Sequence, residues 1–173
     1  MNILRTLTCI TALATLSACA TDVLHASPHP QVNQAATTAV LPFANYTTTP
    51  GAGERAASIT ASLLMTHGLS HTITIHSGSD NGLPLERLPH LRAALTSASR
   101  DGARYAIEGS VEEWRYTIGL DGEPAVAVTL NLINVGTGQT IWTATGSRSG
   151  NPRESVGVLA EKTINAMLNR LLP

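Results

Sequence analysis

The histidines and cysteines are the residues of this chain whose chemistry could support catalysis or metal binding. His67 and His71 are four residues apart, the spacing of two ligands on one helical turn, but Gly68 between them favours the end of a helix. A Gly-x-Ser-x-Gly motif, which would hold a nucleophilic serine, is absent from the sequence. The remaining histidines are not grouped into a site: His25, His29, His76 and His90. We therefore expect a protein that is not an enzyme and that needs no metal or cofactor.

A short apolar segment at the N-terminus leads to a cysteine. Residues 1–18 contain one positive charge, Arg5, an apolar stretch and small residues before Cys19, which is typical of a secretory signal and too short for a membrane span. The sequence Leu16-Ser-Ala-Cys19 resembles the lipobox of bacterial lipoproteins, in which the cysteine is acylated and becomes the first residue of the mature protein. The alternative is an ordinary signal peptide that is cut at another site, with Cys19 unmodified.

Lipidation of Cys19 would determine the compartment of the mature chain. Two or more acyl chains hold a protein stably at a membrane. Ala20 is not the aspartate that resembles the inner-membrane retention signal of lipoproteins, so we expect the periplasmic face of the outer membrane in a diderm bacterium. Cys9 lies in the removed segment, which leaves the mature chain without a cysteine for a disulfide.

Composition indicates one nearly neutral domain close to its membrane. The 173-residue chain carries a formal net charge of −1, and its arginines are scattered singly, without the basic stripe of a nucleic-acid-binding protein. Residues 19–36 predict a lipidated cysteine followed by a flexible tether, because this segment contains prolines and small polar residues but no hydrophobic period. Residues 37–173 predict a single periplasmic domain.

Apolar periodicity predicts alternating strands and helices in the first half of this domain. Residues 38–41 predict a buried strand, and a helix should start near Pro50 behind a hydroxyl cap and stop at Gly68. A short strand is predicted at 72–75. Leucines at helical spacing then predict a second helix over 88–101.

The second half predicts an antiparallel meander followed by a helix. Its β-rich runs cover 105–118, 124–135 and 140–148. In the first run the apolar phase changes between Val111 and Trp114, which predicts a β-bulge within 109–113. The last helix should begin at Asn151, as its cap, and continue to Leu171. The order β-α-β-α-β-β-β-α indicates an α/β (α+β) fold, a mixed sheet with an antiparallel C-terminal meander packed by helices.

This element order and two local motifs resemble the CsgG/TolB N-terminal-like fold family of envelope lipoproteins. In that family a first strand ends in a proline and leads through an asparagine-containing loop to a helix, as in residues 40–45. A late hairpin carries a Thr-Gly turn followed by tryptophan, as in residues 137–142. Asn134 departs from the acidic residue that often precedes this turn. The motifs are packing signatures, so the resemblance implies the fold rather than a chemistry.

The lengths of the connections and of the predicted tether distinguish the members of this family. The connections between elements are too short for the membrane-inserted hairpins of the curli-type secretion pore, and the predicted tether is too short for the lipoprotein activator of penicillin-binding proteins. A compact domain soon after the lipid, with residues 50–55 opening the first helix, resembles the outer-membrane lipoprotein of Pel exopolysaccharide export. That resemblance implies a homo-oligomeric ring, a dodecamer, coaxial with a PelB-like β-barrel exporter, which passes a cationic exopolysaccharide.

The acidic residues of the meander are the candidates for guiding such a polymer, because carboxylates repeated around an opening concentrate a cationic chain. They are Glu108, Glu112, Glu113, Asp121 and Glu123. Taken singly, each is more often a solvated charge on a strand face or in a turn, and Asp121 in an Asp-Gly pair suits a turn best.

Trp142 and Arg104 are the candidates for contacts with other molecules. Trp142 follows a turn and could contact lipid headgroups or the partner barrel, with a place in the core against a helix as the equal alternative. Arg104 could bridge subunits of the ring, with a plain surface arginine as the favoured interpretation. Two other functions stay open: a regulator of a peptidoglycan synthase, and a scaffold for another outer-membrane complex.

Overall fold

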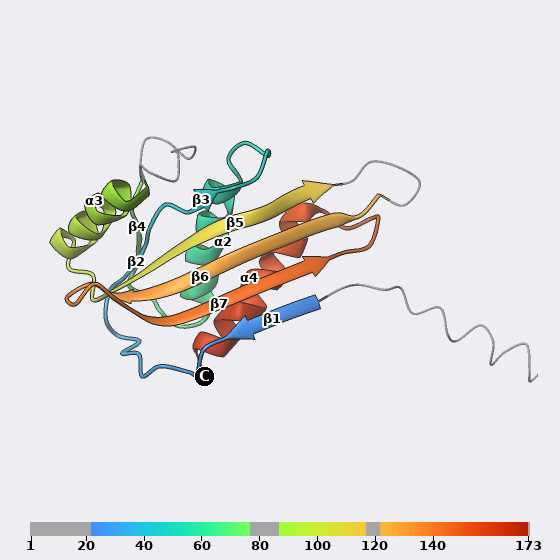
Figure 1. Ribbon diagram of the computed structural model, residues 1–173. Coiled ribbons are helices and arrows are strands. Elements are labelled where there is room, and N and C mark those ends of the chain that lie inside the picture. Colours follow the sequence, from blue (N-terminus) through green and yellow to red (C-terminus); the bar gives the residue numbers. More distant parts are fainter. Residues whose placement is uncertain (1–21, 77–86, 117–121, 173) are drawn as a thin grey trace, which may run out of the picture.

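The computed structural model describes residues 22–76, 87–116 and 122–172, which form a seven-stranded mixed sheet with three helices (Figure 1). The strands are β1 (Asp22–Ala26), β2 (Thr38–Val40), β3 (Ala44–Asn45), β4 (Thr72–Thr74), β5 (Tyr105–Tyr116), β6 (Pro124–Asn134) and β7 (Gln139–Ser149). The helices are α2 (Ala52–Thr66), α3 (Arg87–Arg100) and α4 (Val156–Leu171). The predicted α/β (α+β) fold class is confirmed. The expected signal peptide lies outside the described residues.

The sheet combines a parallel part with an antiparallel meander. Its strand order is β1-β7-β6-β5-β2-β4, and the short β3 pairs with β5 beside this path. β2 runs parallel to both β4 and β5, whereas β5, β6 and β7 form consecutive antiparallel pairs. The predicted meander is therefore confirmed, and β1 and β3 are strands that the sequence pattern did not predict.

Two hydrophobic cores lie on opposite faces of the sheet. Successive side chains of a strand alternate between its faces. Ile107 accordingly joins a larger core with residues of α2 and α4, and its neighbour Ala106 joins a smaller core with residues of α3. In β2, Val40 and Ala39 divide between the same two cores, as expected for a parallel strand that is covered on both faces.

The prediction of a flexible tether over 19–36 is wrong for the part of this segment that the structure describes. β1 pairs antiparallel with β7 along its whole length, and Leu24 packs against the larger core. Further on, the backbone N–H of Asn33 donates a hydrogen bond to the Tyr105 hydroxyl at 3.3 Å. A five-residue edge strand turns too few side chains inward to show a hydrophobic period, so backbone pairing with β7 decides its structure.

The helix starts differ from the predicted caps. Helix α4 begins behind Ser155, whose Oγ accepts a hydrogen bond from the Val158 N–H at 3.2 Å, and not behind Asn151. Helix α2 begins after Gly51, which has a φ of 69° and makes no side-chain cap. The predicted stop at Gly68 is confirmed, because α2 ends two residues earlier and Gly68 adopts a φ of 92°.

No helix in the described residues combines the length and the apolar character needed to cross a bilayer.

Candidate functional site

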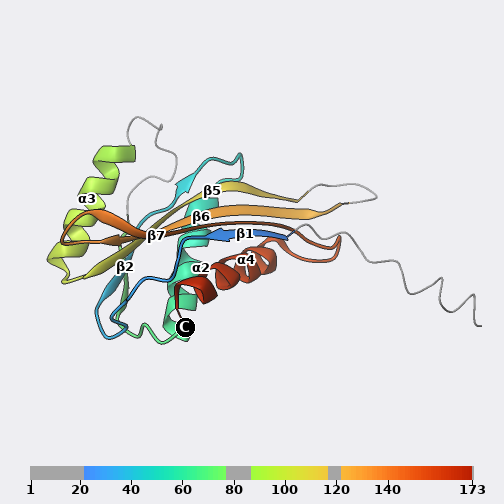
Figure 2. The same cartoon turned by 60° about the horizontal axis from the view of Figure 1, so that its bottom comes forward.

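One face of the sheet is left without a helix over β1, β7 and the parts of β5 and β6 that lie beyond Ala106 and Ile133. Helices α2 and α4 pack on one side, and α3 packs on the other side at the β2 and β4 end, so the rest of that second side is bare in the described part of the chain (Figures 1 and 2). We call this surface the open face. Its polar side chains on β5, β6 and β7 are Glu108, Ser110, Glu112, Glu113, Arg115, Thr129, Asn131, Thr143, Thr145 and Ser147. Val23 and His25 of β1 lie on the same face, opposite Ser147 and Thr145.

A β-bulge in β5 controls which side chains reach the open face. The pairing register of β5 with β6 shifts between Val111 and Glu113, which leaves Glu112 as the extra residue and confirms the predicted bulge. Val111 and Trp114 are both buried in the larger core. Because the bulge restores the inward phase for Trp114, it leaves Glu112 and Glu113 adjacent at the surface of the same strand.

Glu108 is the most buried carboxylate of the open face, with 9% of its surface exposed. It lies directly opposite Asn131 on β6, and the Asn131 Nδ2 donates a hydrogen bond to Glu108 Oε1 at 2.9 Å. A carboxylate at this depth needs hydrogen-bond donors to offset its desolvation. The geometry therefore holds the Glu108 side chain in place on the sheet surface.

Glu112 and Glu113 are bound to neighbouring side chains of their own strand. Glu112 Oε1 accepts a hydrogen bond from the Ser110 hydroxyl, which shows that Glu112 lies on the open face. Glu113 Oε1 forms an ion pair with Arg115 Nε at 2.5 Å, and both of these side chains are substantially solvated. Glu108, Glu112 and Glu113 form a row of three carboxylates along β5, which we call the acidic row. The Arg115 guanidinium lies at the end of this row.

Hydroxyl and amide groups extend the open face across β6 and β7. The Oγ1 atoms of Thr129 and Thr145 are 3.2 Å apart on neighbouring strands. Thr143 and Ser147 occupy the same side of β7. Sequence reasoning did not single out these residues. The signal that could have found them is a polar residue at alternate positions, as at Thr129 and Asn131 of β6 and at Thr143, Thr145 and Ser147 of β7.

Trp142 lies in the larger core, which corrects the predicted contact with lipid headgroups or a partner barrel. It is 1% exposed, and its Nε1 has no hydrogen-bond partner among the described residues. The register of β7 against β6 shifts at Ile141, so that Trp142 comes opposite Leu132 on the helix-covered side. The bulge at Ile141, which the sequence analysis missed, is the physical reason for its burial.

The other predicted residues do not belong to the acidic row. Glu123 is exposed just before β6, and Arg104 is exposed just before β5, with its guanidinium carbon 5.8 Å from the centre of the Tyr105 ring. A role for Arg104 between subunits stays a prediction. Cys19 and Asp121 lie outside the described residues.

The histidine pair does not form a metal site with a third ligand in the described residues, which contain no group of three His, Cys, Asp or Glu side chains suited to hold an ion. The His67 Nε2 instead lies 2.8 Å from Asn165 Oδ1, which joins the end of α2 to α4.

Comparison with known proteins places the chain in a family. Scans against protein-family models and against curated proteins give no match. Among solved structures, the PelC dodecamer from Paraburkholderia phytofirmans is 35% identical to this chain, with a TM-score of 0.75, covering 87% of this chain and 96% of its own. The chain belongs to the PelC family. A variant of the same PelC protein in another crystal form matches at 34% identity and a TM-score of 0.74, over 87% of this chain and 99% of its own.

The fold of this PelC-family chain extends to a more distant lipoprotein. Lipoprotein GNA1162 from Neisseria meningitidis has a TM-score of 0.53 at 16% identity, over 78% of this chain and 99% of its own. At that identity the likeness concerns the fold alone. It indicates that this chain and that lipoprotein share the arrangement of sheet and helices.

Proposed function

We propose that this chain is a non-catalytic lipoprotein of Pel exopolysaccharide export, and that its acidic row guides a cationic polymer. The observation that carries the proposal is the placement of Glu108, Glu112 and Glu113 on one uncovered side of a sheet, in a chain that belongs to the PelC family. Fold alone would not support a function. The acidic row adds a surface whose charge suits the proposed cargo.

The proposed assembly is a ring of identical chains, as in the related PelC dodecamer. A ring needs two different contact surfaces on each subunit, because each copy meets its neighbours head to tail. Closure would repeat the acidic row once per subunit, and carboxylates that line a low-dielectric opening raise the local concentration of a cation. The polymer would then pass to a PelB-like β-barrel exporter in the outer membrane.

The proposed anchor is a lipid on Cys19 after removal of residues 1–18. It would hold the domain at the periplasmic face of the outer membrane. With the domain held there, its carboxylates would attract the cationic polymer close to the point at which the polymer enters the barrel. The attraction falls with added salt, since charges more than a Debye length apart are screened.

The test compares polymer export by cells that carry variants of the full lipidated chain. Glu112→Gln combined with Glu113→Gln keeps side-chain size and hydrogen-bonding capacity but removes two charges, and we expect secreted polymer to fall several-fold. Glu161→Gln is the matched control, because Glu161 is an exposed carboxylate on α4, on the opposite side of the sheet. Equal export by the unchanged chain, the double variant and the control, at equal amounts of folded protein, would show that the acidic row does not guide the polymer.

A further inference from the structure

We propose that hydroxyl and amide groups of the open face bind uncharged sugar units of the exported polymer, beside the acidic row that attracts its cationic units. These groups belong to Thr129 and Asn131 of β6 and to Thr143 and Thr145 of β7, which we call the polar belt. The inference rests on the proposed export of a polysaccharide. It goes further because it adds a second binding surface, which acts through hydrogen bonds and not through charge.

The first argument is the register of the polar belt across the sheet. Thr129 lies directly opposite Thr145, and Asn131 lies directly opposite Thr143. Neighbouring strands are about 4.7–4.9 Å apart, and residues two apart in one strand are separated by about 6.4–6.8 Å. The four side chains therefore form a regular array, which an extended chain can contact at several points at once.

The second argument is that the polar belt is continuous with the acidic row. Asn131 lies opposite Glu108 on β5, and its Nδ2 donates a hydrogen bond to Glu108 Oε1 at 2.9 Å. Thr129 lies opposite Ser110, and the Ser110 hydroxyl donates to Glu112. A polymer held by the carboxylates of β5 therefore meets the hydroxyl and amide groups of β6 and β7 next.

The third argument is the hydrogen-bonding capacity of the polar belt. The Oγ1 atoms of Thr129 and Thr145 are 3.2 Å apart and share one hydrogen bond, which uses one of their two O–H donors. One donor and several acceptor lone pairs of this pair remain for a ligand. Sugar hydroxyl groups also donate and accept, so they can bond to threonine in either direction.

The fourth argument is the size and charge of the side chains. From Ala127 to Asn131 of β6 and from Thr143 to Ser147 of β7, every side chain on the open face is short and uncharged. Solvated surfaces usually carry lysine, arginine and glutamate, and the cores of protein interfaces are rich in aromatic residues, methionine and arginine. The polar belt has neither composition, and its hydroxyl and amide groups match those of a sugar ring.

Binding at one polar belt should be weak, because water competes for each exposed hydrogen-bonding group. In the proposed ring the polar belt is repeated once per subunit, and a long polymer contacts many copies together. Weak contacts of this kind retain the polymer while each sugar unit is still released quickly. Such release is what transport requires, whereas tight binding at a single site would stop the chain.

The test measures binding of two probes to the full lipidated chain in detergent micelles. The probes are the hexamer of N-acetylglucosamine, which is uncharged, and the hexamer of glucosamine, which is cationic. Thr129→Val combined with Thr145→Val keeps the side-chain shape and removes two hydroxyl groups. By ligand-observed NMR, we expect the Kd for the uncharged hexamer to rise about fivefold or more, as for the loss of one net hydrogen bond. An unchanged Kd, or no binding of this hexamer to the unchanged chain, would overturn the inference.

Two hydroxyl groups on the covered side of the sheet provide the matched control. Ser58→Ala combined with Ser62→Ala removes them from exposed positions of α2 and should leave the Kd for both hexamers unchanged. Added salt should weaken binding of the cationic hexamer and leave the uncharged hexamer unaffected. Salt-sensitive binding of the uncharged hexamer would contradict a belt that acts through hydrogen bonds.

The mass of the valine variant by light scattering should equal that of the unchanged chain. A smaller mass would show that this face is a contact between copies of the chain, which overturns the assignment to sugar.

The two surfaces can be tested separately. Glu112→Gln combined with Glu113→Gln should weaken binding of the cationic hexamer and leave the Kd for the uncharged hexamer unchanged. If export depends on these glutamates while the valine variant binds the uncharged hexamer normally, the polar belt is overturned and the proposed function stands. If export does not depend on them while the valine variant loses the uncharged hexamer, the acidic row is overturned and the polar belt stands.

Discussion

Two glycines let neighbouring groups approach the sheet more closely than any side chain would allow. A Cβ at Gly109 would lie 2.7 Å from the Thr129 carbonyl oxygen and 2.8 Å from Cε2 of Phe43, and a Cβ at Gly146 would lie 2.9 Å from Sδ of Met167. These are positions at which the absence of a side chain permits close packing. At Gly109 it permits Phe43 to cover β5.

Replacement of Gly109 with alanine should destabilise the protein, because the added methyl group collides with backbone as well as with the Phe43 ring. Overpacking of this kind costs about 1–3 kcal/mol. Gly157→Ala is the control, since its nearest atom beyond the helix is 4.0 Å away and alanine favours the helix by about 0.5–1 kcal/mol. Urea unfolding measures both, and an equal effect of the two substitutions would contradict the packing argument.

The buried position of Trp142 predicts the behaviour of its fluorescence. In a Trp114→Phe background Trp142 is the remaining tryptophan of the two in the chain. Its emission should be blue-shifted, resistant to iodide and unchanged when phosphatidylglycerol vesicles are added, because the indole is enclosed by the larger core. A change of the emission maximum on vesicle addition would show that Trp142 leaves the core to meet lipid.

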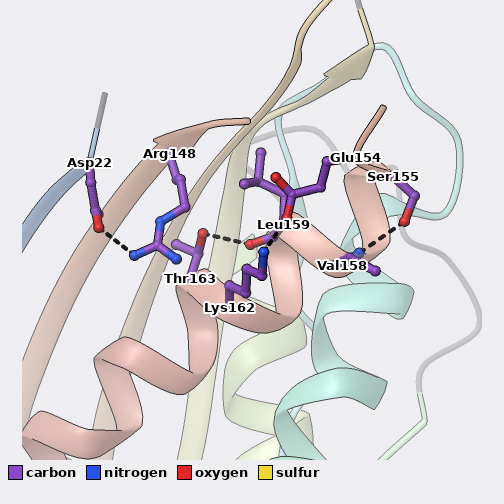
Figure 3. A network of polar contacts seen from close by, with 8 residues as sticks. All are labelled: Asp22, Arg148, Glu154, Ser155, Val158, Leu159, Lys162 and Thr163. Carbon is purple, nitrogen blue, oxygen red and sulfur yellow. Dashed lines mark hydrogen bonds and ion pairs between the residues drawn. The ribbon is translucent and has the colours of Figure 1, made fainter. Parts of the chain in front are cut away.

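At the scale of elements, short polar contacts decide where helices begin. Two capping signals compete before α4, Asn151 followed by proline and Ser155 four residues later. The chain makes a separate turn first, in which the Glu154 N–H donates to the Asn151 carbonyl at 2.9 Å. Glu154 then pairs with Lys162 of α4 at 2.6 Å, as Figure 3 shows. The helix therefore starts at the second signal.

Substitution of the two candidate caps should distinguish them. Ser155→Ala removes the acceptor for the Val158 N–H and should lower the free energy of unfolding by about 1 kcal/mol. Asn151→Ala should change it by less than about 0.5 kcal/mol, because Asn151 is exposed and precedes the helix by a full turn. Thermal unfolding of both variants checks the order, and a larger loss at Asn151 would restore the cap predicted from the sequence.

At the scale of the whole molecule, the two sides of the sheet have different roles. Its covered side is filled by α2 and α4 and supplies the larger core, while the open face carries the acidic row and the hydroxyl groups of β6 and β7. Because β1 belongs to the same sheet as β5, the proposed lipid on Cys19 would be attached to the same rigid sheet that carries the acidic row.

The mass of the lipid-free chain in solution tests the ring. For the segment from Asp22 onward, light scattering after size exclusion should give a mass of many subunits, with twelve expected from the related PelC dodecamer. Such a mass would support the proposal that the acidic row is repeated around a ring. A monomer at all concentrations would contradict the ring and favour the alternative functions, a regulator of a peptidoglycan synthase or a scaffold.

Elements that repeat their pattern over many residues were predictable from the amino-acid sequence alone. The meander, the end of α2 and the bulge in β5 follow from alternation and phase, because a side chain on the wrong side of a half-buried strand exposes apolar surface. The resemblance to the family followed from element order and the motifs at residues 40–45 and 137–142. The glutamates were recognisable as candidates by residue type.

Tertiary structure decided the features that depend on pairing between distant segments. β1 forms because its backbone pairs with the edge of β7. Trp142 is buried because a bulge at Ile141 turns its side chain inward. The acidic row is at the surface because no helix covers that side of β5. In each case the free energy comes from partners far away in the chain, and a short local pattern carries no information about them.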